Sequence, residues 1–183
     1  MIDLAITADH IRTTIGDYLD AHPEERPGLA PVLELLDDGA DLTTRKEFRG
    51  HATAGAILVG PDGRILHIHH LALDKWLLPG GHLETSDATL RDAALRELAE
   101  ETGISADVVT PVGDRPFHID VHPIPPNDAK GEPGHQHFDF RFLFRTATDV
   151  SRLQTEEVTD AAWRDAHSIN DRALRQRVVQ ALR

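Results

Sequence analysis

Residues 79–104, PGGHLETSDATLRDAALRELAEETGI, form the stretch that decides the fold of this chain. The second half of the stretch predicts a helix that ends at Gly103, because glycine is the usual residue just past a helix end. In a helix, Glu97, Glu100 and Glu101 share one face, since residues three and four apart are neighbours. Like charges at this spacing repel, so the cluster indicates a cation that the carboxylates share. Oxygen ligands suit Mg2+ or Mn2+, which commonly bridges carboxylates and phosphates.

The same face of the predicted helix also carries small and apolar residues. Leu90, Ala93 and Ala94 lie close to the carboxylates when the helix is wound at about 100° per residue. Carboxylates beside apolar residues indicate a half-buried surface, where unpaired charge is costly. Arg96 can pair with one carboxylate but cannot neutralise all three. The alternative is a surface helix with an acidic bias, since runs of charge are usually solvated.

The composition excludes several classes of protein. The chain has 183 residues, of which 40% are hydrophobic and 5% aromatic, as expected for one globular domain with an appendage. It has no Cys, which excludes disulfides and thiolate metal sites and favours a cytoplasmic protein. We find no signal peptide pattern and no apolar run near the roughly 18 residues that span a bilayer. The net charge of −12 disfavours nucleic acid and membranes as partners and leaves a homodimer open.

The chain divides into two parts of different character. Residues 1–48 predict a helical extension, with one helix that starts at Thr7 or Asp9 and a second that stops at Gly39. We expect this extension to cover a sheet or a dimer partner rather than to bind substrate. Residues 49–183 predict the main domain.

The main domain mixes strands and helices without regular alternation. The central helix should start at Ser86 or Asp87, both of which are favoured N-cap residues, and a closing helix should span 170–182. This order favours an α/β sandwich with a mixed sheet over repeated βαβ units. Short apolar or alternating runs predict strands at 54–59, 64–70, 75–78, 108–112, 117–121, 138–144 and 160–163, and a loop at 146–157.

The central stretch resembles the Nudix box, and the resemblance covers about residues 50–183. The pattern of that family is Gly, five residues, Glu, seven residues, then Arg-Glu-apolar-any-Glu-Glu-any-Gly-apolar. This chain matches the second half without error from Arg96 onward. The first half departs, because Asp87 replaces Glu after five intervening residues from Gly81, and eight residues rather than seven separate it from Arg96. Glu84 is the other candidate acid in this half.

The resemblance implies a Nudix-type α/β/α sandwich and a divalent-metal-dependent hydrolase. Such an enzyme would cleave a diphosphate linkage in a small nucleotide-type substrate, a nucleoside diphosphate linked to another moiety. Glu97 and Glu101 would bind Mg2+ or Mn2+, and Glu100 would bind metal or act as the base. Arg96 would hold the carboxylates, and the backbone carbonyl of Gly80 would add a ligand. The metal would clamp phosphate oxygens and activate water, while a carboxylate takes the proton.

Two later strands carry polar side chains at every second residue. Period two sends each polar set to one face of its strand. We expect these sets and Glu84 to line the substrate pocket, with Arg141 or Lys130 on a phosphate. The alternatives are a solvated outer face of the sheet and a structural zinc site, although the spacing is not that of a standard zinc finger. The polar sets are His118, Asp120 and His122 on the first strand and His137, Asp139 and Arg141 on the second.

Two other readings of the box remain. An isomerase of the same fold, acting on isoprenoid diphosphate, would resemble enzymes with a catalytic Cys, which this chain lacks. A Nudix-fold sensor or scaffold would bind nucleotide without hydrolysis, and such proteins typically lose the helix carboxylates that are present here. The sequence leaves open which diphosphate is the substrate and which of Glu84 and Asp87 faces the site.

Overall fold

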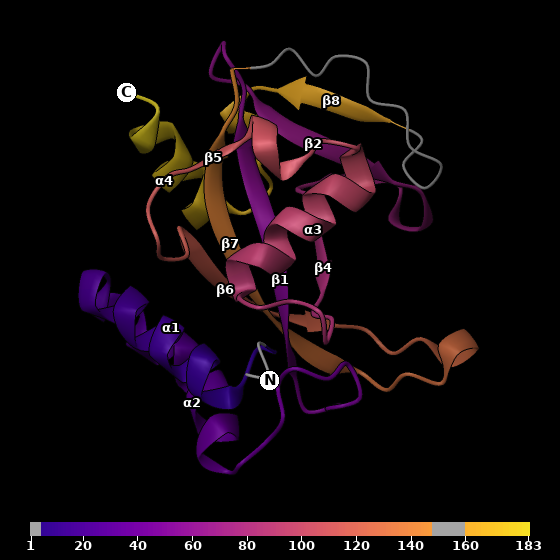
Figure 1. Ribbon diagram of the computed structural model, residues 1–183. Helices are drawn as coiled ribbons and strands as arrows, with labels where there is room; N and C mark the ends of the chain where they lie inside the picture. Colours follow the sequence, from indigo (N-terminus) through magenta and orange to yellow (C-terminus); the bar gives the residue numbers. More distant parts are fainter. Residues whose placement is uncertain (1–4, 148–159) are drawn as a thin grey trace. The chain divides into compact units, whose positions relative to one another are not determined.

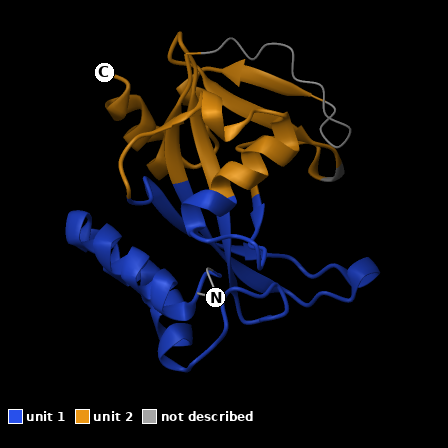
Figure 2. Ribbon diagram, in the orientation of Figure 1, with its two compact units in different colours: residues 1–54, 81–93, 115–141 blue, residues 55–80, 94–114, 142–183 orange. Residues whose placement is uncertain are grey.

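The computed structural model describes residues 5–147 and 160–183 (Figure 1). These residues form two compact units (Figure 2). Unit 1 comprises residues 1–54, 81–93 and 115–141, and unit 2 comprises residues 55–80, 94–114 and 142–183. Among the described residues, none of the helices has the length and apolar character that crossing a membrane requires.

Unit 1 begins with two helices, as the sequence predicts. Helix α1 (Ala8–Ala21) starts after Thr7, whose side chain accepts a hydrogen bond from the backbone N–H of His10. Helix α2 (Ala30–Asp37) follows a 3-10 helix (Pro23–Leu29). Pro27, inside this segment, has no N–H to donate, so a regular α-helix through it would lose a hydrogen bond. Both helices bury an apolar face, formed by Ile11, Ile15, Tyr18, Leu19, Val32 and Leu36.

The strands of unit 1 place the two polar sets opposite each other. Strand β6 (His118–Ile124) pairs antiparallel with β7 (His135–Arg145). The register sets His118 against Arg141, Asp120 against Asp139, and His122 against His137. Unit 1 also contains the first residues of β1 (His51–Val59) and most of β4 (Gly80–His82), which pair with each other. The alternation predicted from the sequence is confirmed.

Gly50 shows why β1 can lie close to β7 in unit 1. A Cβ atom added at Gly50 would stand 2.6 Å from the ring of Phe138 and 3.3 Å from the carbonyl oxygen of Gln136. Only glycine leaves room for this approach of side chain to backbone.

Unit 2 contains the remaining strands of the mixed sheet. The strand order is β3-β2-β1-β7-β5, and β8 pairs with β2. Every residue of β1 is buried, as expected for a strand covered on both faces. Helices cover both sides of the sheet, so the predicted sandwich is confirmed. The further elements are β2 (Ile65–His70), β3 (Lys75–Leu77), β5 (Thr110–Pro111), β8 (Ala161–Arg164), α3 (Leu90–Thr102) and α4 (Arg172–Ala181).

The central helix α3 begins at Leu90, so the expected start at Ser86 or Asp87 is wrong. The hydroxyl group of Thr89 accepts a hydrogen bond from the backbone N–H of Asp92 at 3.0 Å and donates one to its carboxylate at 2.8 Å. Thr89 therefore caps the helix, with an acidic residue three positions later as in a capping box.

The C-terminal end of α3 lies where the sequence predicts. Gly103 has φ +73° and donates its N–H to the carbonyl oxygen of Ala99 at 2.8 Å. A left-handed glycine that closes the last turn in this way is a common helix stop. Residues 148–159, which include most of the predicted loop at 146–157, lie outside the described residues. The division of the chain at residue 48 stays a prediction.

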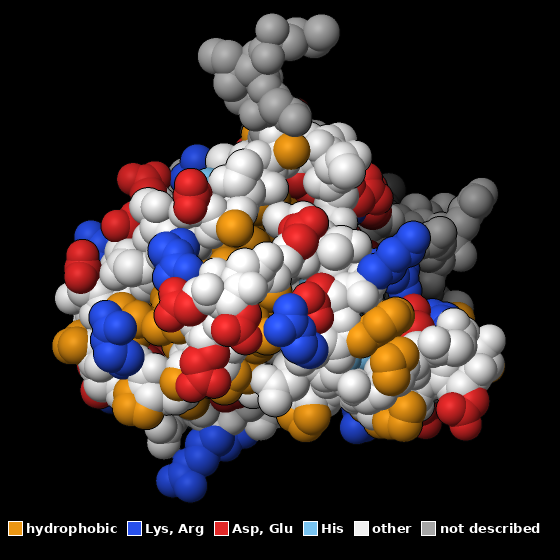
Figure 3. Space-filling view, turned by 90° about the horizontal axis from the view of Figure 1, so that it is seen from below, with side chains coloured by type: hydrophobic (Ala, Val, Ile, Leu, Met, Phe, Trp, Pro, Cys, Tyr) orange, Lys and Arg blue, Asp and Glu red, His pale blue; other side chains and the backbone are white. Residues whose placement is uncertain are grey.

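Figure 3 shows how charged side chains are distributed on one face of the molecule. On the face drawn in Figure 3, acidic and basic side chains lie interspersed, and only small areas of histidine are visible. The net charge of −12 is therefore not gathered into one acidic patch on that face.

Candidate active site

The carboxylate face of α3 belongs to unit 2, where Arg96 organises it. One guanidinium nitrogen of Arg96 donates to Glu97 at 3.0 Å and to Glu100 at 3.0 Å. The side chains of Arg96 and Glu97 are 17% and 13% exposed, whereas that of Glu100 is 52% exposed. Arg96 thus contacts two carboxylates rather than the one expected. It fixes the half-buried Glu97 and leaves part of Glu100 open to water.

Glu101 contacts the loop that precedes the box. Its Oε2 atom accepts a hydrogen bond from the backbone N–H of Gly80 at 2.9 Å. The preceding residue, Pro79, gives its carbonyl oxygen to the backbone N–H of Ala56 at 2.9 Å. The peptide group that joins Pro79 to Gly80 is therefore hydrogen-bonded to both β1 and α3.

The donor atoms of this cluster fit a hard divalent cation. Glu97, Glu100 and Glu101 offer carboxylate oxygens from one helix face, and the hydrogen bond from the Gly80 N–H to Glu101 brings the backbone of Gly80 close to them. Carboxylate and carbonyl oxygens are the ligands that Mg2+ and Mn2+ prefer. The half-buried setting of the cluster also fits, because such a setting strengthens the attraction between carboxylates and a cation.

The first-half acids lie in unit 1, in the loop before α3. The buried carboxylate of Asp87 accepts the backbone N–H of Glu84 at 2.8 Å, and the backbone N–H of Asp87 donates to the carbonyl oxygen of Glu84 at 3.0 Å. Asp87 therefore shapes the loop instead of capping the helix. The side chain of Glu84 is exposed.

The polar face of the β6–β7 hairpin in unit 1 is a connected network. Arg141 donates from Nε to Asp139 at 2.7 Å, and its Nη2 lies 3.7 Å from Asp120. Asp139 also accepts from the hydroxyl of Thr53 at 3.1 Å. The Arg141 side chain is only 15% exposed. This face is half-buried rather than a solvated outer surface.

His122 and Asp120 are hydrogen-bonded to each other within this network. The Nδ1 atom of His122 lies 2.8 Å from Asp120 Oδ2. This hydrogen bond raises the pKa of His122 and lowers the pKa of Asp120. Both shifts favour the charged pair.

Histidine rings gather around His137 in the same unit. The ring centroids of His51, His82, His122 and His135 lie between 4.9 and 5.7 Å from that of His137. Burial lowers the pKa of His137 to about 3 and the pKa of His82 to about 4, and nearby cationic groups add to the effect. The two rings are neutral at neutral pH.

Sequence reasoning missed three members of this cluster. His135 could have been found, because it precedes His137 by two residues and shares its face of the strand. His51 and His82 gave no local signal, since strand pairing brings them to the cluster from far along the chain.

Each unit collects part of the expected site. The metal-binding and catalytic candidates come together in unit 2, and the substrate-binding candidates lie in unit 1. The first group is Gly80, Arg96, Glu97, Glu100 and Glu101; the second is Glu84, His118, His122, His137, Asp139 and Arg141.

The fold and the carboxylate face of α3 together define a hydrolase of the Nudix class. Residues 49–182 match the model of the NUDIX domain, and the chain belongs to this family. The predicted resemblance is confirmed.

Among its relatives is the "Probable DHNTP pyrophosphohydrolase" of Lactococcus lactis subsp. cremoris. The two are 32% identical over 144 residues, which cover 76% of this chain and 80% of the relative. "Phosphatase NudJ" of Escherichia coli K12 is 48% identical over 61 residues, which cover 32% of this chain and 39% of the relative.

Two solved structures show the same fold. The Ap4A hydrolase of C. elegans gives a TM-score of 0.54 at 18% identity, covering 72% of this chain and 96% of that one. The dihydroneopterin triphosphate pyrophosphohydrolase of E. coli gives a TM-score of 0.52 at 20% identity, covering 72% of this chain and 94% of that one.

Proposed function

We propose that this chain is a divalent-metal-dependent pyrophosphohydrolase that cleaves a diphosphate linkage in a small nucleotide-type substrate. The observation that carries the proposal is the carboxylate face of α3 held against the box loop by the Gly80–Glu101 hydrogen bond. The relative from Lactococcus makes dihydroneopterin triphosphate the first substrate to test.

Glu97, Glu101 and the carbonyl of Gly80 would hold the Mg2+ or Mn2+, with Glu100 as a further ligand or as the base. When bound, the metal supplies charge neutralisation on the phosphate oxygens and lowers the pKa of a water molecule. Arg96 serves as a positioning residue, because it holds Glu97 and Glu100 on the same side of the helix.

The exposed part of Glu100 suits it to take a proton. Hydrolysis forms a bond from a water oxygen to phosphorus and breaks the bond from that phosphorus to the bridging oxygen. The water loses a proton in this step, and the half-exposed Glu100 carboxylate can accept it. Arg96 keeps that carboxylate oriented through the contact at 3.0 Å.

Selection of the substrate falls to the β6–β7 hairpin in this proposal. Arg141 is the candidate phosphate contact, because a guanidinium pairs with phosphate in a bidentate manner. It is already bound to Asp139, so a phosphate would have to share or replace that ion pair. Glu84, His118, His122 and His137 are the other candidates.

The competing proposal is a nucleotide-binding sensor or scaffold without hydrolysis. A screen separates the two: purified protein is incubated with dihydroneopterin triphosphate, nucleoside triphosphates, nucleotide sugars, dinucleotide cofactors or prenyl diphosphates, with Mg2+ or with EDTA. Pyrophosphate or phosphate release that needs Mg2+ supports the hydrolase. Saturable binding of a nucleotide with no product from any compound supports the sensor. A homodimer and a cytoplasmic location stay predictions.

A further inference from the structure

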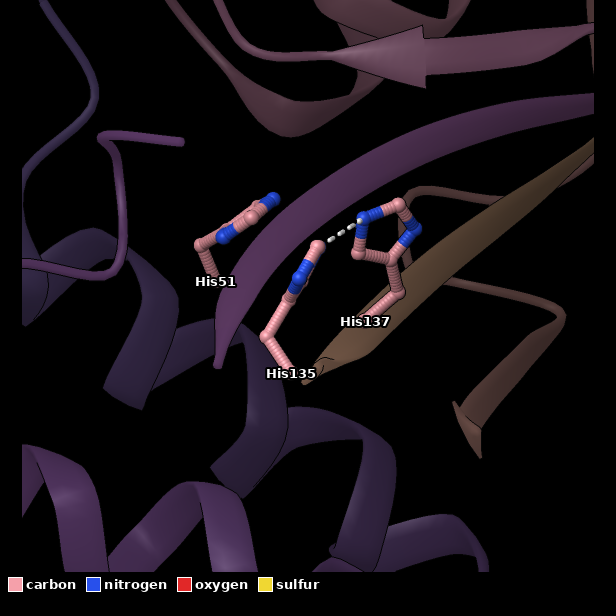
Figure 4. Close-up of side chains that lie close together, drawn as sticks. All are labelled: His51, His135 and His137. Atoms are coloured by element: carbon pink, nitrogen blue, oxygen red, sulfur yellow. Dashed lines mark hydrogen bonds between the residues drawn. The ribbon is translucent and has the colours of Figure 1, made fainter. Parts of the chain in front are cut away.

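Three histidines of unit 1 converge on one point (Figure 4). His51 is the first residue of β1, and His135 and His137 lie on one face of β7. One ring nitrogen from each lies within 4.8 Å of the other two. The Nε2 atoms of His135 and His137 are 3.2 Å apart.

Backbone carbonyl groups fix which nitrogen of two rings carries the hydrogen. The Nδ1 atom of His51 lies 3.2 Å from the carbonyl oxygen of Glu47, and that of His135 lies 2.9 Å from the carbonyl oxygen of Pro133. Because a carbonyl oxygen only accepts, each Nδ1 is the donor. In a neutral ring, Nε2 then carries the lone pair. The contact of Nδ1 with a backbone carbonyl is also typical of metal-binding histidines.

The Nε2 atom of His51 is the unusual atom of the cluster. His51 is 1% exposed, and within residues 5–147 and 160–183 its Nε2 has no hydrogen-bond partner. Buried polar atoms are nearly always paired, so an unpaired lone pair among imidazole rings indicates a ligand. The pair at 3.2 Å fits as well, since two nitrogens on a tetrahedral zinc ion are separated by about 3.3 Å.

We propose that His51, His135 and His137 form a binding site for a divalent transition-metal ion, Zn2+ in the first place, through their Nε2 atoms. Imidazole nitrogen suits Zn2+, Co2+ and Ni2+, whereas Mg2+ prefers oxygen. The ring centroid of His82 lies 5.2 Å from those of His51 and His137, so His82 is the candidate fourth ligand. The ion would link the first residues of β1 to the first residues of β7.

This site differs in chemistry from the carboxylate face of α3. It has three nitrogen donors on strands of unit 1, whereas the Nudix metals are expected on oxygen donors of unit 2. Zinc binding therefore can be measured with saturating Mg2+ present.

The test uses full-length protein without a histidine tag, stripped with EDTA and dialysed into buffer with saturating Mg2+. Titration with Zn2+ against a chromophoric chelator should show one tight ion per chain, and Co2+ should give the intense visible absorption of a tetrahedral site. His135→Gln and His137→Gln should each weaken Zn2+ binding at least tenfold. His70→Gln, at an exposed position on β2, should leave it unchanged, as should Glu101→Gln.

Two results would overturn the proposal. One is the absence of a stoichiometric Zn2+ ion on the wild-type protein. The other is a wild-type Zn2+ affinity in both histidine variants. If only Glu101→Gln lost Zn2+ affinity, the ion would lie on α3 instead. Circular dichroism of each variant separates loss of the site from loss of the fold.

Discussion

Replacing Glu101 by Gln tests the chemistry of the carboxylate face without changing its shape. The amide oxygen of Gln can still accept the hydrogen bond that Gly80 donates at 2.9 Å. A neutral acceptor is weaker than a charged one, which costs about 1 kcal/mol of folding free energy. Lower repulsion from Glu97 and Glu100 offsets part of that cost. We therefore expect the melting temperature to change by no more than about 4 °C.

The turnover number should respond far more strongly than the stability. Loss of a metal-binding carboxylate removes stabilisation of the transition state, and we expect kcat to fall at least about 100-fold, equivalent to about 2.7 kcal/mol. The assay is pyrophosphate release from the best substrate under saturating Mg2+. Glu34→Gln, the same change at an exposed position of α2, is the matched control.

Two outcomes would refute this reasoning. A kcat for Glu101→Gln close to that of Glu34→Gln would place the metal site elsewhere. A large fall in melting temperature would show that Glu101 holds the fold together through Gly80.

Three further predictions concern the hairpin and the sheet. Arg141→Ala should raise KM at least about tenfold, equivalent to about 1.4 kcal/mol, because it removes the candidate phosphate contact. Gly50→Ala should lower the free energy of unfolding by about 1–3 kcal/mol in a urea titration, because its Cβ would meet Phe138. His67 is buried, and burial lowers its pKa below 6.5, so the unfolded chain takes up a proton that the folded chain does not. Burial of the neutral His67 ring therefore stabilises the fold fully above pH 6.5, and this stabilisation is lost as the pH falls below 6.5. The free energy of unfolding of His67→Gln should then depend less on acid than that of wild type.

Each of these predictions has a control variant or an outcome that would contradict it. An unchanged KM in Arg141→Ala would mean that the polar face does not bind the phosphate. Gly28→Ala adds a Cβ with nothing within 4 Å and should be far milder than Gly50→Ala. An unfolded histidine takes up its proton between about pH 7 and pH 5. If the free energy of unfolding of wild type and of His67→Gln fell equally over this range, His67 would not be a source of the acid sensitivity.

Local patterns predicted much of what the structure shows. Gly103 ends α3 because glycine adopts the left-handed conformation at no steric cost. The alternation on β6 and β7 depends only on strand geometry, and the register then sets Asp120 against Asp139. Arg96 pairs with Glu97 and Glu100 because these residues lie one and four positions further along the helix.

The start of α3 shows where local reasoning fails. Asp87 and Thr89 are both favoured caps, and propensity alone does not choose between them. The carboxylate of Asp87 is used by the loop, through the N–H of Glu84, so the helix starts after Thr89.

The histidine cluster was not predicted in full because it depends on pairing between distant segments. His51 and His135 are far apart in the sequence, yet their rings stack with centroids 4.8 Å apart. Only the order of strands in the sheet brings them together, and nothing near His51 in the sequence indicates that order.

The most direct test of the central claim is metal depletion and add-back on the purified enzyme. The protein is freed of metal with EDTA, and pyrophosphate release from dihydroneopterin triphosphate is followed before and after addition of Mg2+ or Mn2+. We predict no product without metal and full recovery with Mg2+ or Mn2+, in wild type but not in Glu101→Gln. Turnover by the wild-type enzyme that continues in EDTA would contradict the assignment of the α3 carboxylates as the metal site. A wild-type rate in the Glu101→Gln variant with Mg2+ would contradict it as well.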